Sequence, residues 1–479
     1  MAKAVERMSR VDTAWLRMDT DANLMMIIGV WLLEPAITHE ALCRRVEESL
    51  LKYRRFRQKV VEDALGASWV EDDDFDVRRH VVRETLKRRR GQSLTEALQR
   101  RVGELAIQPL DPAHPLWQYH LIETYDGGSA MIARIHHCIA DGIALIAVMM
   151  SMVDGGKPPP RSARSTPDAV AEGHGDWLSD SVLRPLTDVA VKALGLYGEG
   201  VAKSVDLLAH PEQSVTGTVG LARSGMQVIG DAAAILLMAD DSPTRLKGKP
   251  ARGKRVAWCP QLPLADVKAV GRALGCSIND VLLATTAAAI GGYLRDHGDD
   301  TSGQEIRAMV PVNLRPLAEA HELGNRFGLV PLVLPIGIEN PVERVYEVRK
   351  RMRELKGSYQ PLLAFAMLMI AGLLVKPAQA ALLNYFARKA TAVMTNVPGP
   401  AQPVQLCGAT LKESMFWVPQ SGDIGMGASI LSYGGGVQFG LITDARLCPD
   451  PEAIVARFRP EFEKLLWLTL MLPWGEGET

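Results

Sequence analysis

The sequence predicts a protein of the α/β (α+β) class with two related domains, each a mixed β-sheet with helices. A β-hairpin followed by a helix is expected at residues 118–150 and again at 428–466. Between them, Pro, Ser, Arg and Gly dominate from residue 154 to 175, a composition typical of a linker. We therefore expect an N-terminal domain, a linker with packed crossover helices and a C-terminal domain, at residues 1–153, 154–247 and 248–479.

The composition is that of a globular protein and disfavours nucleic acid as a partner. Of the 479 residues, 47% are hydrophobic and 23% are charged. The formal net charge is −1, whereas a nucleic-acid-binding protein is normally basic. The 6 cysteines are scattered singly without a CxxC pair, which favours reduced thiols in a cytosol over a disulfide framework or a structural zinc site.

The sequence predicts neither a secretory signal nor a membrane-spanning helix. Residues 1–20 alternate charged and apolar side chains and lack the basic-then-apolar order of a signal peptide. The apolar runs at 24–33 and 361–375 fall short of the roughly 18 residues that a spanning helix needs. We therefore expect a cytoplasmic protein that is soluble or peripherally bound.

Hydrophobic periodicity and turn residues place the elements of the first half. Strands are expected at residues 27–33, 69–70, 77–82, 118–123 and 129–135. Helices are expected at 38–51, with Thr38 as cap, at 94–105 and at 143–150. Asp126 and Gly127 between the last two strands are a strong hairpin signal. The basic residues 53–59 are expected on a solvated surface.

The same reasoning places the elements of the linker and the second half. Helical segments are expected within residues 177–238. Strands are expected at 255–259, 305–312, 327–335, 428–433 and 437–442. Helices are expected at 264–274, 278–294, 341–356, 361–375, 380–386 and 451–466, and a rigid turn at 395–400.

The stretch from residue 135 to 142 places two histidines at the rim of the first sheet. It joins a strand to a buried helix, so the strand ladder holds a histidine whose ring can be aimed. Asp141 at the helix start can cap free N–H groups or hold a nearby cation. Gly142 suits a corner where the backbone comes close to another group or takes a positive φ.

Several interpretations of His136 and His137 compete. A buried histidine is usually a satisfied core residue. A shared metal ion is disfavoured, because neighbours on a strand point to opposite faces. Cys138 lies in an apolar run and is more typical of a small core residue than of a nucleophile. A general base is the sharper hypothesis, because neutral imidazole is available near pH 7.

The pattern His-His-x-x-x-Asp-Gly at 136–142 resembles the signature of the CoA-dependent acyltransferase superfamily. Further motifs occur in order: Pro-Leu-Trp at 115–117, Ser-Ile-Asn-Asp at 277–280, Val-Asn-Leu-Arg-Pro at 312–316 and Thr-Asn-Val-Pro-Gly-Pro at 395–400. Together they extend over nearly the whole chain and resemble the bacterial wax ester synthase/diacylglycerol acyltransferase family.

The resemblance implies a fold and a reaction. Two chloramphenicol-acetyltransferase-like domains would enclose an active-site tunnel. Acyl-CoA, as co-substrate, and a long-chain alcohol or diacylglycerol would give CoA and a wax ester or triacylglycerol for storage. His137 would remove the hydroxyl proton, so that the alkoxide attacks the thioester directly, and His136 would support the geometry. Neither a permanently bound cofactor nor a metal is implied.

Residues outside this corner are assigned through the same resemblance. Asn279 and Asp280 form a pair that the family links to its active site, and the Asn279 amide is a candidate hydrogen-bond donor. Ser277 and Asp280 also match a capping box, with Asp in place of Glu, so a structural role stays open. Arg315 is expected to pair with Asp141, as an arginine of the other half does in related acyltransferases; the alternative is a surface arginine.

Three remaining features have both a structural and a functional interpretation. Pro115 and Trp117 are expected to be packing anchors near the site. The turn at 395–400 offers backbone donors to CoA or is only a stiff corner. The pair of apolar helices at 361–386 is buried core by default. The functional hypothesis is a lipid-facing patch, because hydrophobic substrates come from a membrane or droplet. We favour peripheral contact with the inner face of the cell membrane or with lipid droplets.

Two other functions stay open. One is an acyl-CoA-dependent transferase of the same fold with another alcohol or an amine as acceptor. The other is a non-catalytic lipid-droplet binding protein. Substituting His137 distinguishes the last of these from an enzyme, because only an enzyme loses turnover.

Overall fold

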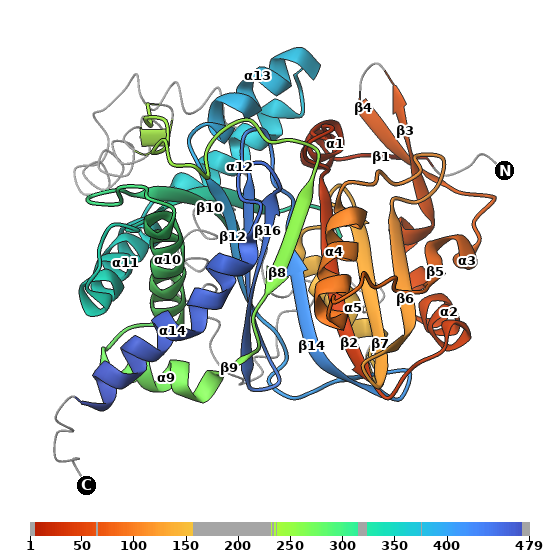
Figure 1. Cartoon of the computed structure of the whole chain (residues 1–479). Coiled ribbons are helices and arrows are strands. Elements are labelled where there is room, and N and C mark those ends of the chain that lie inside the picture. The colour runs from red at the N-terminus through yellow and green to blue at the C-terminus, as the bar shows by residue number, and fades with distance from the viewer. Residues whose placement is uncertain are drawn as a thin grey trace, which may run out of the picture.

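The computed structural model of the chain describes residues 5–63, 66–156, 231, 234–235, 237–314, 323–374 and 376–471. Two sheet-and-helix halves lie side by side in them (Figure 1). The helices predicted within 177–238 lie almost entirely outside the described residues, as does Arg315.

The sheet of the first half has six strands in the order β13-β14-β2-β7-β6-β5. Their bounds are β2 Met26–Glu34, β5 Val81–Glu84, β6 Trp117–Tyr125, β7 Gly128–His136, β13 Gln405–Leu406 and β14 Ala409–Trp417. Strands β13 and β14 come from the second half of the chain and were not predicted. Strand β14 pairs antiparallel with β2, with Trp417 opposite Ile28, so one sheet contains strands of both halves.

The predicted hairpin of the first half is confirmed as β6 and β7. Asp126 has φ 47° and Gly127 has φ 78°, the left-handed pair that a two-residue hairpin turn requires. Every residue of β7 is buried, so this strand is a rigid support for the residues that follow it.

The sheet of the second half has the strand order β11-β10-β12-β15-β16-β8, and β9 pairs with β16. The bounds are β8 Lys254–Trp258, β9 Leu262–Pro263, β10 Ile306–Asn313, β11 Phe327–Leu334, β12 Ala392–Pro398, β15 Met426–Tyr433 and β16 Gly436–Asp444. The prediction of a turn at 395–400 was wrong in its first part. Residues 395–398 belong to β12, which is paired in parallel with both β10 and β15, and the chain turns only from Gly399.

Helices cover both sheets. Those of the first half are α1 Arg10–Arg17, α2 His39–Glu48, α3 Val77–His80, α4 Leu94–Ala106 and α5 Gly142–Met152. Those of the second half are α9 Leu264–Ala273, α10 Ile278–Asp296, α11 Pro341–Lys356, α12 Gln360–Ala371, α13 Lys376–Ala387 and α14 Pro451–Leu470. The prediction of a strand at 77–82 was wrong for its first residues, because Asp76 caps a helical turn by accepting from Arg78 N (2.9 Å) and strand β5 begins only afterwards.

A small third sheet, in the order β1-β4-β3, includes the last two residues of the basic segment at 53–59 in its strand β3. Its strands are β1 Glu6–Arg7, β3 Gln58–Asp63 and β4 Gly66–Glu71, and short 3-10 turns precede it at Leu50–Lys52 and Arg54–Arg57. The expectation of a solvated surface here was wrong for Arg55. Its side chain is 15% exposed, and its guanidinium lies 4.2 Å from the ring centroid of Trp69, a cation–π contact.

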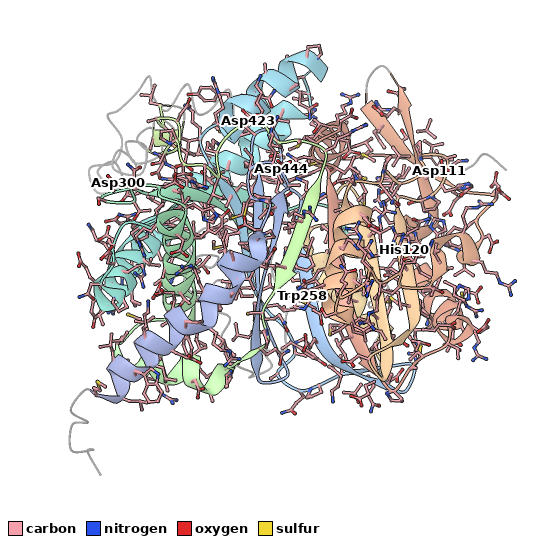
Figure 2. The ribbon with its side chains drawn as sticks, in the orientation of Figure 1. Asp111, His120, Trp258, Asp300, Asp423 and Asp444 are labelled. Atoms are coloured by element: carbon pink, nitrogen blue, oxygen red, sulfur yellow. The ribbon has the colours of Figure 1, made fainter. Side chains whose placement is uncertain are left out.

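The two halves share an apolar junction. Trp258 of β8 packs on Trp417 of β14, with ring centroids 5.9 Å apart, and lies in the middle of the molecule (Figure 2). Helix α4 brings Leu98 and Val102 into the same buried cluster. The hairpin-then-helix ending is confirmed in both halves, as β6 and β7 before α5 and as β15 and β16 before α14.

Among the helices of the described residues, none is both long and apolar enough to cross a membrane alone. Helices α9 and α10, bent by 100° at their junction, pass that test only as a pair, on length and composition. Most residues of α10 are buried inside the protein.

Candidate active site

The site is built where strand β7 ends. His136 is the last residue of β7, and its N–H donates to the Leu116 carbonyl (2.9 Å). The His137 N–H donates to the Met25 carbonyl (2.7 Å), so the chain remains tied to the sheet beyond the strand. The predicted tight corner between strand and helix is therefore present, and it fixes the backbone of His137.

The His137 ring is held by aromatic neighbours. The indole of Trp15, from α1, stacks on it with centroids 4.2 Å apart and planes 18° apart. The Phe327 ring lies 5.5 Å away at a tilt. Burial lowers the pKa of His137 to about 3, so the ring is neutral near pH 7. Its Nδ1 atom is buried and has no hydrogen-bond partner among the described residues.

His136 has different surroundings. Its Nε2 lies 3.3 Å from Asp19 Oδ1, and the Cys138 N–H donates to its Nδ1 (3.2 Å). Burial lowers the pKa of His136, but Cys138 and Asp19 raise it by more, so its pKa lies above the ordinary value. The amide donor at Nδ1 nevertheless favours the neutral ring with its proton on Nε2, where Asp19 accepts it. His136 thus holds the corner in place.

Asp141 joins the two halves at the start of α5. Its Oδ1 accepts from Ala144 N (2.9 Å), which caps the helix as predicted. Its Oδ2 accepts from the backbone N–H of Arg326 (3.1 Å), a residue of the second half. The pairing predicted with Arg315 involves a residue outside the described part of the chain, so it stays a prediction.

Gly142 plays a different part from the one predicted. It begins helix α5 with a helical backbone, so the expectation of a positive φ or of a close backbone contact was wrong. A Cβ at this position would meet no atom of the described residues within 4 Å, and Gly142 lines the cavity described below. The absence of a side chain therefore keeps space open beside Asp141.

A buried polar bridge that the sequence did not predict supports His137 from behind. Asn325 Nδ2 donates to the His137 carbonyl (2.8 Å) and to Asp12 Oδ1 (2.7 Å). Asp12 also accepts from the Asn325 N–H (3.2 Å), and burial raises the pKa of Asp12. Because Asp12 and Trp15 are three residues apart on α1, one face of this helix holds both the backbone and the ring of His137.

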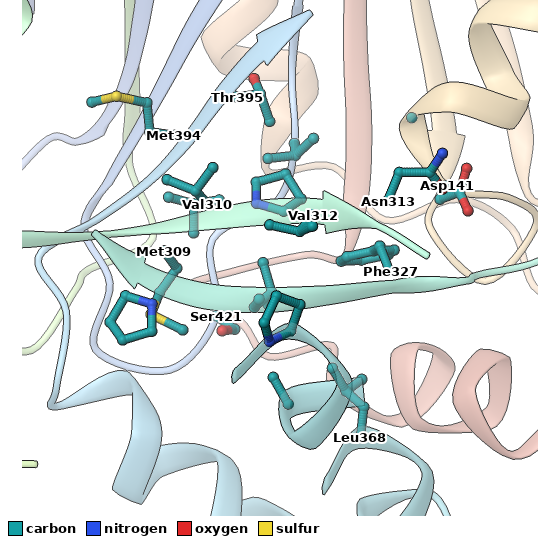
Figure 3. Close-up of a pocket in the computed structure, with 18 of the residues that line it drawn as sticks. Asp141, Met309, Val310, Val312, Asn313, Phe327, Leu368, Met394, Thr395 and Ser421 are labelled. Atoms are coloured by element: carbon teal, nitrogen blue, oxygen red, sulfur yellow. The ribbon is translucent and has the colours of Figure 1, made fainter. Parts of the chain in front are cut away.

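A largely apolar cavity of about 320 Å³ extends from this corner into the second half. His137, Asp141 and Gly142 line one end, and Asn313 lies near Asp141 there (Figure 3). The rest is lined mainly by apolar side chains, including Trp15, Ile143, Ile146, Leu283, Val310, Val312, Leu329, Met367, Leu383, Met394 and Phe416. Such a lining fits long hydrocarbon chains.

Asn279 reaches this cavity and Asp280 does not. Asn279 lines the cavity, and its Oδ1 accepts from Asn396 Nδ2 on β12. Asp280 forms the capping box of α10, in which it accepts from Ser277 N (2.9 Å) and its own N–H donates to Ser277 Oγ (3.2 Å). The structural interpretation of Ser277 and Asp280 therefore holds, and Asn279 is the polar residue of this motif at the cavity.

We expect Asn396 to act through Asn279. With Oδ1 of Asn279 occupied by Asn396, the Nδ2 group of Asn279 is the side of the amide that can donate to a ligand. Asn396→Leu should lower kcat by about 10- to 100-fold with little change in KM, less than the roughly 100- to 1,000-fold loss on removing such a donor, because Asn396 only orients the Asn279 amide. Steady-state kinetics of Asn279→Leu, Asn396→Leu and the double variant test this. Fully additive losses in the double variant would contradict a shared role.

Pro115 and Trp117 are packing residues. The Trp117 ring is fully buried and stacks on His80 at 4.5 Å, and its Nε1 donates to the Phe56 carbonyl (2.9 Å). The Pro115 carbonyl accepts from Trp117 N (2.8 Å). Within the described ranges, there is no group of three or more His, Cys, Asp or Glu residues that could hold a metal ion.

Solved structures define the class of the fold. The structure of the wax ester synthase/diacylglycerol acyltransferase from Marinobacter aquaeolei VT8 matches with a TM-score of 0.65 at 20% identity, covering 97% of this chain and 100% of that one. A first condensation domain of the calcium-dependent antibiotic synthetase, in complex with a substrate analogue, matches with a TM-score of 0.57 at 16% identity, covering 98% and 97%. The fold is therefore that of the two-domain acyltransferases and condensation domains, as predicted.

Sequence comparisons identify the family within this class. Residues 8–282 match the wax ester synthase/diacylglycerol acyltransferase catalytic domain, and residues 323–466 match the WS/DGAT C-terminal domain. The chain belongs to this family and is an acyl-CoA-utilising acyltransferase. A probable diacylglycerol O-acyltransferase of Mycobacterium tuberculosis is 27% identical over 462 residues, 93% of this chain and 92% of that protein. Wax ester synthase/diacylglycerol acyltransferase 4 of Arabidopsis thaliana is 24% identical over 424 residues, 81% and 76% of the two chains.

Proposed function

We propose that the protein transfers a long-chain acyl group from acyl-CoA to a fatty alcohol or a diacylglycerol, with His137 as the general base. The observation that carries this proposal is a neutral imidazole, stacked on Trp15, that lines a largely apolar cavity of about 320 Å³. Nδ1 is buried without a partner among the described residues, so we assign the role of base to Nε2. A base that is neutral near pH 7 can accept a proton from a hydroxyl group.

The reaction needs no covalent enzyme intermediate. His137 Nε2 takes the hydroxyl proton as the acceptor oxygen bonds to the thioester carbonyl carbon. The tetrahedral intermediate then expels the CoA thiolate, which takes the proton from the imidazolium. The products are CoA and a wax ester or triacylglycerol. The Asn279 amide is the candidate donor to the oxyanion, since it lines the same cavity.

A CoA-release measurement tests this function. Wild-type protein and His137→Ala are incubated with palmitoyl-CoA and with either hexadecanol or a diacylglycerol, and free thiol is measured. We expect release that depends on the acceptor and is lost in the variant. Release of equal size without an acceptor would contradict transfer. If folded protein releases no CoA with either acceptor, the result would favour a different acceptor or a binding role.

We further propose that helices α12 and α13 rest on a lipid surface, at the inner face of the cell membrane or on lipid droplets. Ile370 is 53% exposed and Leu373 is 58% exposed, whereas Leu368 on the same segment is buried at the cavity. Helix α12 and the turn that follows it thus present apolar side chains both to the cavity and to solvent, which supports contact with lipid.

Replacing Ile370 and Leu373 together by glutamate should lower the fraction bound to phosphatidylcholine/phosphatidylglycerol vesicles by at least about 10-fold, because two apolar contacts become charges. Vesicle flotation measures that fraction. The control is Tyr346→Glu, which changes a 45% exposed side chain of α11. Equal binding of the double variant and wild type would contradict this surface.

A further inference from the structure

Strands β10 and β11 form the edge of the second sheet and pass through the cavity. Successive side chains of a strand point to opposite faces. Met309 and Val310 are neighbours on β10, yet both line the cavity, and Figure 3 places them on opposite sides of the strand. The cavity therefore has space on both faces of this strand pair.

One face lies under helices α10 and α11. Val310 and Val312 of β10 belong to it, because they pack with Leu355 of α11 in one apolar cluster. Leu283 of α10, which also lines the cavity, belongs to the apolar cluster against which Val310 and Leu355 pack. We call this space the α11 arm.

The other face lies under helices α12 and α13. Phe327 and Leu329 of β11 pack there with Leu368 of α12 and Leu383 of α13. Met309 of β10 packs on the same face, against the cluster that includes Ala387 of α13. We call this space the α12 arm.

The two arms meet at the corner that holds His137. The strand pair ends with Asn313 opposite Phe327. The Phe327 ring lies 5.5 Å from the His137 ring, and Asn313 lies near Asp141 (Figure 3). Two chains lying on opposite faces of β10 and β11 would thus bring their ends together at the proposed base.

We infer that β10 and β11 separate two chain-binding sites, with the acyl chain of acyl-CoA in the α11 arm and the hydrocarbon chain of the acceptor in the α12 arm. This inference rests on the proposed function, in which two long chains react at His137. It goes beyond that function by giving each substrate its own face of the strand pair, with Val310 and Met309 as residues that determine chain length.

One observation assigns the arms. The α12 arm lies under helices α12 and α13, and both Ile370 of α12 and Leu373 of the turn between these helices are exposed. This arm therefore lies next to the surface that we propose to rest on lipid, from which a water-insoluble acceptor would arrive. The α11 arm is then left for the acyl chain of the donor, which is delivered from water as its CoA ester.

The test uses two neighbouring positions on one strand. Val310 precedes Asn313 by three residues and Met309 by four, about 10 and 13 Å at roughly 3.3 Å per residue. Bulk at these positions should stop long chains while short ones still reach His137. Val310→Phe should lower kcat/KM for palmitoyl-CoA relative to hexanoyl-CoA by at least about 10-fold, with the acceptor preference changed by less than about 2-fold. Met309→Trp should do the reverse, lowering kcat/KM for hexadecanol relative to hexanol.

Because both substitutions lie on β10, a loss that follows only from damage to the strand would change both preferences in both variants. That result, or an exchange of the two effects, would overturn the assignment. Val310→Ala and Met309→Ala enlarge the same arms and should shift the matching preference toward longer chains; no shift in either would also overturn it. Wild type and His137→Ala are run alongside, so that failure of transfer itself is seen as absence of CoA release by wild type.

Discussion

His137→Ala is expected to lower kcat for acyl transfer by about 100- to 10,000-fold, the usual contribution of a general base. The loss should appear in kcat with KM for both substrates changed little, because the imidazole contributes little apolar surface to the cavity. Acceptor-dependent CoA release measures it. A circular dichroism spectrum like that of the wild type and a cooperative unfolding transition would establish that the variant is folded. A variant with at least half of the wild-type kcat would contradict the role of His137.

The pH dependence provides an independent check on the same residue. His137 acts in its neutral form, and burial lowers its pKa to about 3. Activity should therefore persist well below pH 6.5, where an ordinary histidine becomes protonated. A plot of kcat/KM between pH 4.5 and 8 should show no decrease with an apparent pKa near 6.5 that arises from the base. Such a decrease, at pH values where the protein remains folded, would contradict a buried neutral base.

The shifted pKa of His137 should also make the free energy of unfolding depend on pH. The folded state keeps His137 neutral, whereas the unfolded chain binds a proton as the pH falls through about 6.5. The free energy of unfolding should therefore fall with pH below about 6.5, and less so in His137→Ala.

The elements that the sequence predicted well have strong local signals. The capping box of Ser277 and Asp280 begins α10, and the Asp126 and Gly127 turn joins β6 to β7. Strand β14 has no such signal. It pairs with β2, hundreds of residues earlier in the chain, so its place depends on a contact between distant segments. The hydrophobic periodicity of a strand does not predict which distant strand it pairs with.

The same division applies to the site. His137, Asp141 and Asn279 were found from their motifs, and all three line the cavity. Asn325 and Trp15 were not assigned to the site, although they hold His137 directly. Asn325 follows Gly324 in a region that resembles the family's, but no role was predicted for it, and Trp15 lies outside the quoted motifs. Both roles follow from the packing of α1 and β11 against the corner. A weak signal was present in α1, whose Asp12 is a buried acidic residue three positions before a tryptophan.

The second large effect is expected at Asp141, because one carboxylate satisfies donors from both halves. Asp141→Ala leaves the N–H groups of Ala144 and Arg326 without these acceptors. By the usual cost of a lost helix cap and an unsatisfied backbone group, the free energy of unfolding should fall by about 2–4 kcal/mol. Denaturant titration measures this change.

Asp141→Asn is the matched control, because its side-chain oxygen can still accept from Ala144 while the negative charge is gone. If the carboxylate mainly caps α5, the Asn variant should recover most of the stability and of the kcat. If its charge orders the junction between the halves, the Asn variant should be almost as impaired as the Ala variant. Wild-type stability in Asp141→Ala would contradict both roles. The comparison thus separates the local function of Asp141 in α5 from its function between β7 and β11, which is where the two halves of the site are joined.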